Sequence, residues 1–127
     1  MSVENGRWAL DLDRLIDALT PDTRCVVMNT PNNPTGWTLG ADDRDRLMNH
    51  CRKHGIWIVA DEVYNRLYRH GPAAPSFVEV AKPEDRIIII NSYSKAWAMT
   101  GWRLGWMIAP PELEAPLAML TEFNIAG

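Results

Sequence analysis

Short apolar runs, separated by polar and turn-forming segments, set the pattern of this chain. Three of the runs are apolar throughout, at residues 25–28, 56–60 and 87–90. Continuous apolar runs of this length, without alternation, are typical of parallel strands that helices cover on both faces. We therefore predict three strands of one parallel sheet, each buried on both of its faces.

Helix-forming patterns occupy the spaces between these runs. The first segment has apolar residues at helical spacing, at Leu12, Leu15, Ile16 and Leu19. This spacing predicts a helix over residues 8–19 that Pro21 closes. A polar helix is expected over 41–54, ended by Gly55, and a short helix over 76–81.

The last third of the chain predicts one more strand, over residues 102–109, and a final helix that Pro110 and Pro111 open. A strand that follows 87–90 after a short connection would run antiparallel to it. The expected fold class is α/β. It is a partial three-layer α/β/α arrangement with a mostly parallel sheet of about four strands, the last one antiparallel.

Composition narrows the class of protein. The chain has 127 residues, of which 46% are hydrophobic and 23% charged, and its formal net charge is -3. This balance predicts one soluble globular domain that binds neither nucleic acid nor an anionic membrane. The sequence contains no apolar run of the roughly 20 residues that span a bilayer. The N-terminus carries no export signal, so we expect a cytoplasmic protein.

Cysteine and histidine usage does not indicate a disulfide framework or a metal site. Cys25 and Cys51 form no CxxC pair, as expected in a reducing compartment. His50 and His54 are four residues apart, but the glutamate of a zinc-protease helix is missing between them. We interpret the two histidines as cations that complement the dipole at a helix C-terminus.

Polar groups follow each predicted parallel strand and precede the antiparallel one. In chain order they are Asn33, Asp61, Tyr64, Ser92, Lys95 and Arg103. Ligands of open α/β sheets bind outside the carboxyl ends of the strands. If the strands are neighbours, all six groups therefore converge on one rim of the sheet, and the sequence predicts a ligand site there.

Each group also has an ordinary structural interpretation when it is taken alone. Asn33, which precedes Pro34, fits a turn. Asp61 and Glu62 fit a solvated strand end, Lys95 fits an ion pair, and Arg103 fits a surface position. The combined interpretation as one site is favoured because separate strand ends all supply matching chemistry.

Three motifs in this chain resemble the signatures of class I and II aminotransferases. They are Asn-Asn-Pro-Thr-Gly at 32–36, Asp-Glu-Val-Tyr at 61–64, and Ser-Tyr-Ser-Lys followed by Met-Thr-Gly-Trp-Arg-Leu-Gly within 92–105. Their order and internal spacings match those of this family of fold type I enzymes, whose cofactor is pyridoxal 5′-phosphate. The resemblance implies that residues 1–127 are the central part of the cofactor-binding large domain, with the small domain and the N-terminal part of the large domain absent.

The resemblance also implies catalytic roles for three residues. Lys95 is expected to hold the cofactor aldehyde as a Schiff base and to carry a proton during catalysis. Asp61 is expected to keep the pyridine nitrogen protonated, so that the ring can absorb an electron pair. Tyr64 is expected to donate a hydrogen bond to the phenolic oxygen of the cofactor.

Further cofactor contacts are implied in the same way. Asn33 is expected to join Tyr64 at the phenolic oxygen, while Ser92 and Arg103 anchor the phosphate, which a planar guanidinium can grip with two bonds. Ser94 is interpreted as the cap of the turn that follows rather than as a phosphate contact. Four aromatic residues are interpreted as packing residues rather than cofactor-stacking rings. They are Tyr93, Trp97, Trp102 and Trp106.

The implied function is transfer of an amino group between an amino acid and a 2-oxo acid, in an enzyme that is a homodimer. Two alternatives stay open at this point. One is a carbon–sulfur β-lyase or synthase of the same fold, and the other is a non-catalytic regulator domain that senses pyridoxal phosphate. The family is about three times as long as this chain. We therefore expect the isolated 127 residues to be inactive and to retain the cofactor weakly.

Overall fold

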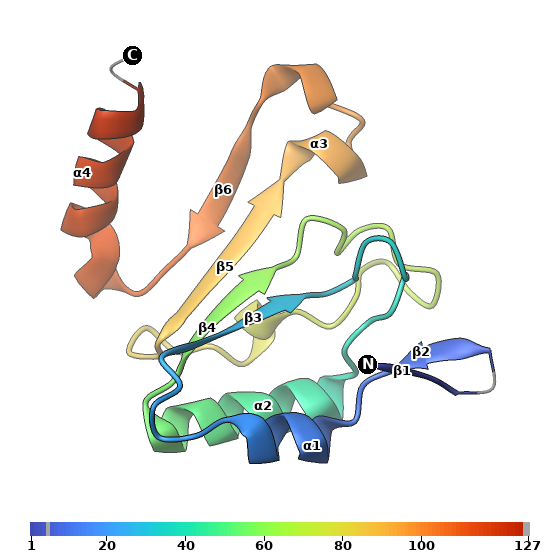
Figure 1. The fold of residues 1–127 in the computed structure, drawn as a ribbon. Helices are drawn as coiled ribbons and strands as arrows, with labels where there is room; N and C mark the ends of the chain where they lie inside the picture. The colour runs from blue at the N-terminus through green and yellow to red at the C-terminus, as the bar shows by residue number, and fades with distance from the viewer. Residues whose placement is uncertain (5, 126–127) are drawn as a thin grey trace.

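A computed structural model describes residues 1–4 and 6–125 of the chain (Figure 1). The strands are β1 (Ser2–Glu4), β2 (Arg7–Ala9), β3 (Cys25–Asn29), β4 (Trp57–Asp61), β5 (Ile87–Ser92) and β6 (Gly105–Ile108). The α-helices are α1 (Leu12–Ala18), α2 (Ala41–His54), α3 (Tyr93–Ala96) and α4 (Glu114–Ile125). The 3₁₀ helices are η1 (Phe77–Glu79), η2 (Thr100–Trp102) and η3 (Pro111–Leu113).

The main sheet has the strand order β3-β4-β5-β6. β3, β4 and β5 pair in parallel, and β6 pairs antiparallel with β5. The α/β class, the mostly parallel four-stranded sheet and its antiparallel last strand are therefore confirmed. The same register places the carboxyl ends of β3, β4 and β5 and the beginning of β6 at one edge of the sheet (Figure 1). We call this edge the rim.

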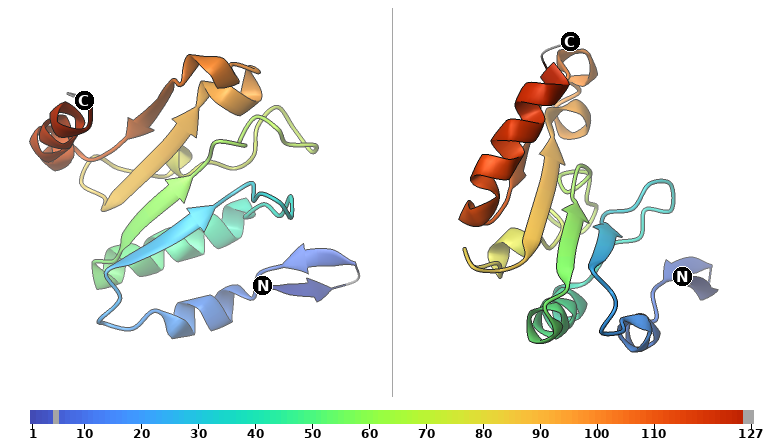
Figure 2. Two further views of the ribbon diagram at one scale, coloured as in Figure 1. Left: turned by 45° about the horizontal axis from the view of Figure 1, so that its top comes forward. Right: turned by 60° about the vertical axis from the view of Figure 1, so that its left-hand side comes forward.

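One face of the sheet packs against α1 and α2, which lie side by side beneath it (Figures 1 and 2). The core between them is apolar, with α2 contributing Leu47, Met48 and Cys51. Alternate residues of the strands point into this core because successive side chains of a strand lie on opposite faces. They are Val26 and Met28 of β3, Ile58 and Ala60 of β4, and Ile87 and Ile89 of β5.

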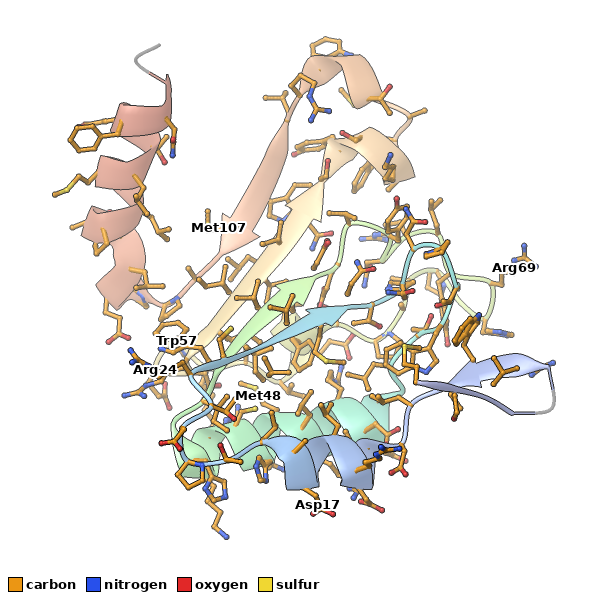
Figure 3. The ribbon with its side chains drawn as sticks, viewed as in Figure 1. Asp17, Arg24, Met48, Trp57, Arg69 and Met107 are labelled. Carbon is orange, nitrogen blue, oxygen red and sulfur yellow. The ribbon has the colours of Figure 1, made fainter. Side chains whose placement is uncertain are left out.

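The prediction that each strand is buried on both faces is wrong for the described residues. Val27 of β3 is 69% exposed, and Ile90 of β5 is also exposed. Figure 3 shows Met48 between α2 and the strands, whereas Met107 projects from β6 away from that layer. Met48 is 2% exposed and Met107 is 50% exposed. The apolar pattern correctly indicated a parallel sheet, but it did not indicate which face the described helices cover.

The helix predicted over residues 8–19 begins later than expected. Asp11 is its N-cap, because its carboxylate accepts a hydrogen bond from the Arg14 amide at 2.9 Å, and α1 runs only from Leu12 to Ala18. Trp8 lies instead in β2, where it pairs with Val3 of β1 in a small hairpin. The apolar spacing that predicted the helix begins at Leu12, so nothing in the pattern supported the first four residues.

The remaining elements lie close to their predicted ranges. The helix at 41–54 is α2, and Gly55 ends it in the left-handed conformation at φ 66°, which glycine adopts readily. The expected helix at 76–81 is the shorter 3₁₀ turn η1, and the strand expected over 102–109 is limited to β6. None of the helices in the described part of the chain is both long and apolar enough to cross a membrane.

Candidate active site

The loop after β3 presents Asn33 through a set of hydrogen bonds that its side chains make to the backbone and to one another. The Asn29 carbonyl oxygen Oδ1 accepts from the Asn33 amide at 3.1 Å and from Asn32 Nδ2 at 3.0 Å. Asn32 Oδ1 in turn accepts from the Thr35 hydroxyl at 2.7 Å. The buried Thr30 hydroxyl accepts from the Leu39 amide at 2.9 Å and closes the loop. The backbone around Asn33 is therefore fixed, while its side chain is exposed at the rim.

The end of β4 brings Asp61 and Tyr64 to the same rim. Asp61 is opposite Asn29 of β3 and Ile90 of β5 in the sheet register. Its side chain lies on the face opposite the α2 core, as the alternation from buried Ala60 requires. Asn33 Nδ2 donates to the Tyr64 hydroxyl oxygen at 2.9 Å. Two residues 31 positions apart, both predicted to contact one ligand oxygen, are thus in direct contact.

α3 follows β5 without an intervening loop and carries Lys95. Ser92 is its N-cap, since the Ser92 hydroxyl oxygen accepts from the Ser94 amide at 3.0 Å. The same hydroxyl donates to the Leu104 carbonyl at 3.3 Å. The interpretation of Ser94 as the cap is therefore wrong: Ser92 fills that role, and Ser94 is buried within the helix. The Lys95 side chain is exposed.

Arg103 precedes β6 and returns to the rim because β6 is antiparallel to β5. Its backbone is left-handed, with φ 52°, a conformation that is costly for a residue with a side chain. Its guanidinium is exposed and donates from Nη1 to the Thr100 carbonyl at 3.1 Å. Strained backbone of this kind is concentrated at ligand sites, which is consistent with the predicted role of Arg103.

Gly105 lets β6 approach β5 next to this arginine. A Cβ at Gly105 would lie 2.6 Å from the Asn91 carbonyl oxygen, closer than side-chain carbons approach other atoms. Gly105 pairs with Ser92 in the register. The absence of a side chain at this position therefore sets the spacing between the strand that leads to Lys95 and the segment that carries Arg103.

The buried acid that the sequence reasoning missed is Glu62. It was grouped with Asp61 as part of a solvated strand end, but its side chain is only 1% exposed. Its carboxylate accepts from the Ser76 hydroxyl at 2.6 Å and from the Phe77 amide at 2.8 Å. Burial raises the pKa of Glu62 above its ordinary value, although both hydrogen bonds favour the charged form.

A buried arginine links this acid to α2. Arg44 donates from Nη1 to the Ser76 carbonyl at 2.8 Å and to Glu79 Oε2 at 2.6 Å. The Arg44 guanidinium lowers the pKa of Glu79 through that hydrogen bond. No local sequence signal connects Glu62 with Ser76, because they are 14 residues apart in an irregular segment.

Two other expectations about side chains need correction. The four aromatic residues expected to pack are all at least 36% exposed, and the contacts of three of them are with one another, with ring centroids 4.9–6.0 Å apart. These three are Tyr93, Trp97 and Trp106. His54 lies in the last turn of α2, as the cation interpretation expects, but His50 lies before that turn, and burial and then the neighbouring His54 lower the pKa of His50. The described residues contain no cluster of three or more side chains suited to a metal ion.

A sequence profile of the family described as Aminotransferase class I and II matches residues 2–126. The chain is 38% identical to aromatic-amino-acid aminotransferase 2 of Thermococcus litoralis over 121 residues, which are 95% of this chain and 31% of that protein. It is 37% identical to the arginine–pyruvate transaminase of Pseudomonas aeruginosa over 124 residues, or 98% of this chain and 31% of that protein. The chain thus spans about a third of the length of these curated relatives.

Solved structures show the same likeness. An aspartate aminotransferase variant of Thermus thermophilus superimposes with a TM-score of 0.79 at 35% identity, covering 89% of this chain and 29% of that one. The aromatic aminotransferase of Pyrococcus horikoshii gives a TM-score of 0.82 at 31% identity, covering 94% of this chain and 32% of that one. The fold of this chain therefore resembles about a third of each of these solved aminotransferase structures.

Proposed function

Because the chain belongs to the class I and II aminotransferase family, we propose that its rim forms the cofactor side of an active site that transfers an amino group between an amino acid and a 2-oxo acid. Enzymes of this family depend on pyridoxal phosphate. The observation that carries the proposal is the convergence at one rim of groups from four neighbouring strand ends. Two of these groups, Asn33 and Tyr64, are joined directly by a hydrogen bond of 2.9 Å.

The residues at the rim fit pyridoxal phosphate by the chemistry of their donors and acceptors. A phenol and an amide in contact, Tyr64 and Asn33, supply donors for one phenolic oxygen. Asp61 supplies a carboxylate for a pyridine nitrogen. The exposed guanidinium of Arg103 suits a phosphate group, since its planar fork can donate two parallel hydrogen bonds. Lys95 supplies an amine from α3, which directly follows β5.

When bound, pyridoxal phosphate supplies an aldehyde that attaches to an amine and a ring that takes up an electron pair from the substrate α-carbon. Lys95 would hold the aldehyde through its amine, and the same amine would move a proton at the substrate α-carbon. Asp61 keeps the pyridine nitrogen protonated, which favours withdrawal of electrons into the ring. Arg103 orients the whole group through its phosphate.

Ser92 has a second task that competes with phosphate binding. Its hydroxyl oxygen caps α3 and its proton points to the Leu104 carbonyl. The assignment of Ser92 as a phosphate anchor stays a prediction. Replacing Ser92 with alanine would remove the α3 cap as well, so Arg103 is the better residue with which to test phosphate binding.

The lysines of the chain provide an internal control for the proposal, because Lys53 and Lys82 are exposed like Lys95 but lie away from the rim. Treatment with pyridoxal phosphate and then borohydride should label Lys95 in preference to the other two. We expect Asp61→Ala and Arg103→Ala each to lower the labelling of Lys95 alone. Equal labelling of all three lysines in the wild-type chain and in both variants would refute the assignment.

The retention of cofactor by the 127 residues is expected to be weak. Labelling of Lys95 should therefore rise with excess pyridoxal phosphate, and Lys95→Ala should retain only the background labelling of Lys53 and Lys82. A stable adduct on Lys95 at stoichiometric cofactor would contradict weak retention while supporting the site.

The reaction itself is tested in a family-length polypeptide that contains this segment. We expect amino transfer from an amino acid to a 2-oxo acid, with the pyridoxamine form of the cofactor produced in the first half-reaction. Release of pyruvate and ammonia without that form would identify the β-lyase or synthase alternative. Cofactor binding with neither reaction would identify the regulator alternative.

Homodimer formation and a cytoplasmic location are part of the same proposal; the first rests on the resemblance and the second on sequence features such as the cysteine usage. Light scattering of the family-length polypeptide, at the concentration used for the activity assay, measures the first. A monomer with full activity would contradict the expected dimer.

A further inference from the structure

Glu62 faces the core while its neighbour Asp61 faces the rim, because adjacent residues at the end of a strand point to opposite faces. The Glu62 amide donates to the Ile90 carbonyl at 2.9 Å and so extends the β4–β5 ladder by one residue. The Glu62 carbonyl then accepts from the Asn65 amide at 2.8 Å. Tyr64 lies inside this tight turn, so the geometry of the turn sets where its phenol points.

The turn at 62–65 is fastened to the segment at 74–77 on both sides of Tyr64. Before Tyr64, the Glu62 carboxylate binds the Ser76 hydroxyl and the Phe77 amide. After Tyr64, Asn65 and Ala74 exchange two bonds of 2.9 Å, one from each residue to the carbonyl of the other. The segment at 76–79 is itself held to α2 by Arg44.

Burying the Glu62 carboxylate costs desolvation free energy, so stability alone does not explain an acid at this position. An apolar side chain of similar size in a buried position is often as stabilising as a charged group. Among side chains of this length, only a carboxylate supplies two acceptor oxygens, here one for a backbone amide and one for a hydroxyl. The Ser76 oxygen already accepts from the Val78 amide at 3.2 Å, so its own proton is directed to Glu62.

We propose that Glu62 is a positioning residue that holds Tyr64, and through it the Asn33–Tyr64 pair, from the core side of the sheet. The functional meaning of this coupling rests on the proposed function, in which Tyr64 and Asn33 contact the cofactor. The coupling itself is a property of the chain and can be measured without cofactor.

The test uses the 127-residue chain with 3-fluorotyrosine in place of its tyrosines, which are Tyr64, Tyr68 and Tyr93. Fluorine NMR then reports each phenol, and Tyr64→Phe identifies the Tyr64 signal. Glu62→Gln keeps the acceptor for the Phe77 amide but replaces the acceptor for Ser76 with a donor. Ser76→Ala removes the hydroxyl and leaves Glu62 in place, and it is the milder variant should Glu62→Gln fold poorly.

Asp85→Asn is the matched control. Asp85 is also a buried carboxylate that accepts from an amide, that of Lys82 at 2.6 Å, and from a side chain, that of Arg52 at 2.8 Å. It lies just before β5, at the edge of the sheet opposite the rim. It therefore reports what the loss of a buried acid does in general.

We expect Glu62→Gln and Ser76→Ala to shift or broaden the Tyr64 signal and to speed amide exchange at Asn65 and Ala74 by about tenfold, the scale of one lost buried hydrogen bond. Asp85→Asn should leave the Tyr64 signal at its wild-type position. An unchanged Tyr64 signal in both Glu62→Gln and Ser76→Ala, or an equal shift in Asp85→Asn, would overturn the proposal.

Labelling with pyridoxal phosphate separates this inference from the proposed function. If Tyr64 responds as expected but the cofactor does not select Lys95, the positioning role stands and the cofactor site is refuted. If the cofactor selects Lys95 and Tyr64 does not respond, the cofactor site stands and the positioning role of Glu62 is refuted.

Discussion

The two phenylalanines of this chain lie in opposite environments. Phe77 is fully buried beneath the sheet, whereas Phe123 on α4 is 81% exposed. They represent a packed region, residues 12–92, and an exposed region, residues 93–125. Every residue of the hydrophobic core in the described part of the chain lies between Leu12 and Ile89. Figure 2 shows the same division, with α4 standing at the β6 side of the sheet, away from α1 and α2.

The division runs through the proposed site. Asn33, Asp61 and Tyr64 are presented by the packed region, where loops and strand ends are fixed by hydrogen bonds to α2, β5 and the η1 segment. Lys95 and Arg103 are presented by the exposed region. A binding site is precise only where its residues are supported by packed neighbours. Within this chain, the Asp61 carboxylate and the Tyr64 phenol are therefore held more rigidly than the Lys95 amine and the Arg103 guanidinium.

The largest expected effect is the difference in unfolding free energy between alanine variants of the two phenylalanines. Phe77→Ala removes a ring from the core and should lower the free energy of unfolding by about 3–5 kcal/mol. Phe123→Ala should change it by less than about 0.5 kcal/mol, as is usual for exposed positions. Urea unfolding followed by circular dichroism measures both. Similar losses in the two variants would show that α4 is packed in solution and that the division is wrong.

The second prediction tests the close approach of β6 to β5 at Gly105. Gly105→Ala places a Cβ against the Asn91 carbonyl, and the strands must separate, so we expect a loss of about 1–3 kcal/mol. Gly101→Ala is the control, because a Cβ there meets no atom within 4 Å. Amide exchange in β6 should accelerate in the first variant only. Equal behaviour of the two would mean that β6 is not paired with β5 as tightly as the structure indicates.

Sequence reasoning succeeded where the signal was local or repeated. The apolar runs predicted the parallel strands, and the polar stretch that ends at Gly55 predicted α2. The polar residues that follow the strands predicted the rim. Those strands turned out to be neighbours, as the rim argument required. Each of these signals is carried by residues close together in the chain.

The failures occurred where the local signal was absent or misleading. Glu62 is charged and follows a strand, which indicates solvent, and its partners Ser76 and Phe77 come 14 and 15 residues later. The hairpin of β1 and β2 has strands of three residues, too short for an alternating pattern. The exposure of Val27 depends on what lies above the sheet, which the residues of the strand do not encode.

The third prediction concerns pH, because the buried acids of the described residues, Glu62 and Asp85, both lie in the packed region. The hydrogen bond from Arg52 holds the pKa of Asp85 below its ordinary value. Its contribution to stability is therefore present above the ordinary pKa of about 3.9 and is lost as the pH falls through the lowered value.

The contribution of Glu62 to stability depends on pH in the opposite direction. Burial raises its pKa, so its contribution is complete below the ordinary value of about 4.3 and is lost as the pH rises through the raised value. Asp85→Asn should reduce the loss of stability in acid, and Glu62→Gln should reduce the loss above pH 4.3, each by up to about 1.4 kcal/mol per pH unit. Urea midpoints between pH 2.5 and 7 measure the slopes. Slopes equal to the wild-type slopes in both variants would contradict the assignment.

The smallest expected effects compare one side-chain hydrogen bond to a helix of each region. Asp11 caps the first turn of α1, and the Thr121 hydroxyl donates to the Leu117 carbonyl at 2.8 Å within α4. Asp11→Ala leaves an amide of a packed helix without its cap and should cost about 1 kcal/mol. Thr121→Ala removes a bond to a carbonyl that the helix already uses.

The gain in helix propensity on going from threonine to alanine should offset the loss of that bond, so we expect Thr121→Ala to be neutral or slightly stabilising. The two variants are matched because each loses one exposed, local bond between a side chain and the backbone. Urea unfolding distinguishes them, provided that the transition of the packed region is followed. A loss of about 1 kcal/mol in Thr121→Ala would show that α4 folds together with the sheet, and the rigidity attributed to Asp61 and Tyr64 would then extend to Lys95 and Arg103.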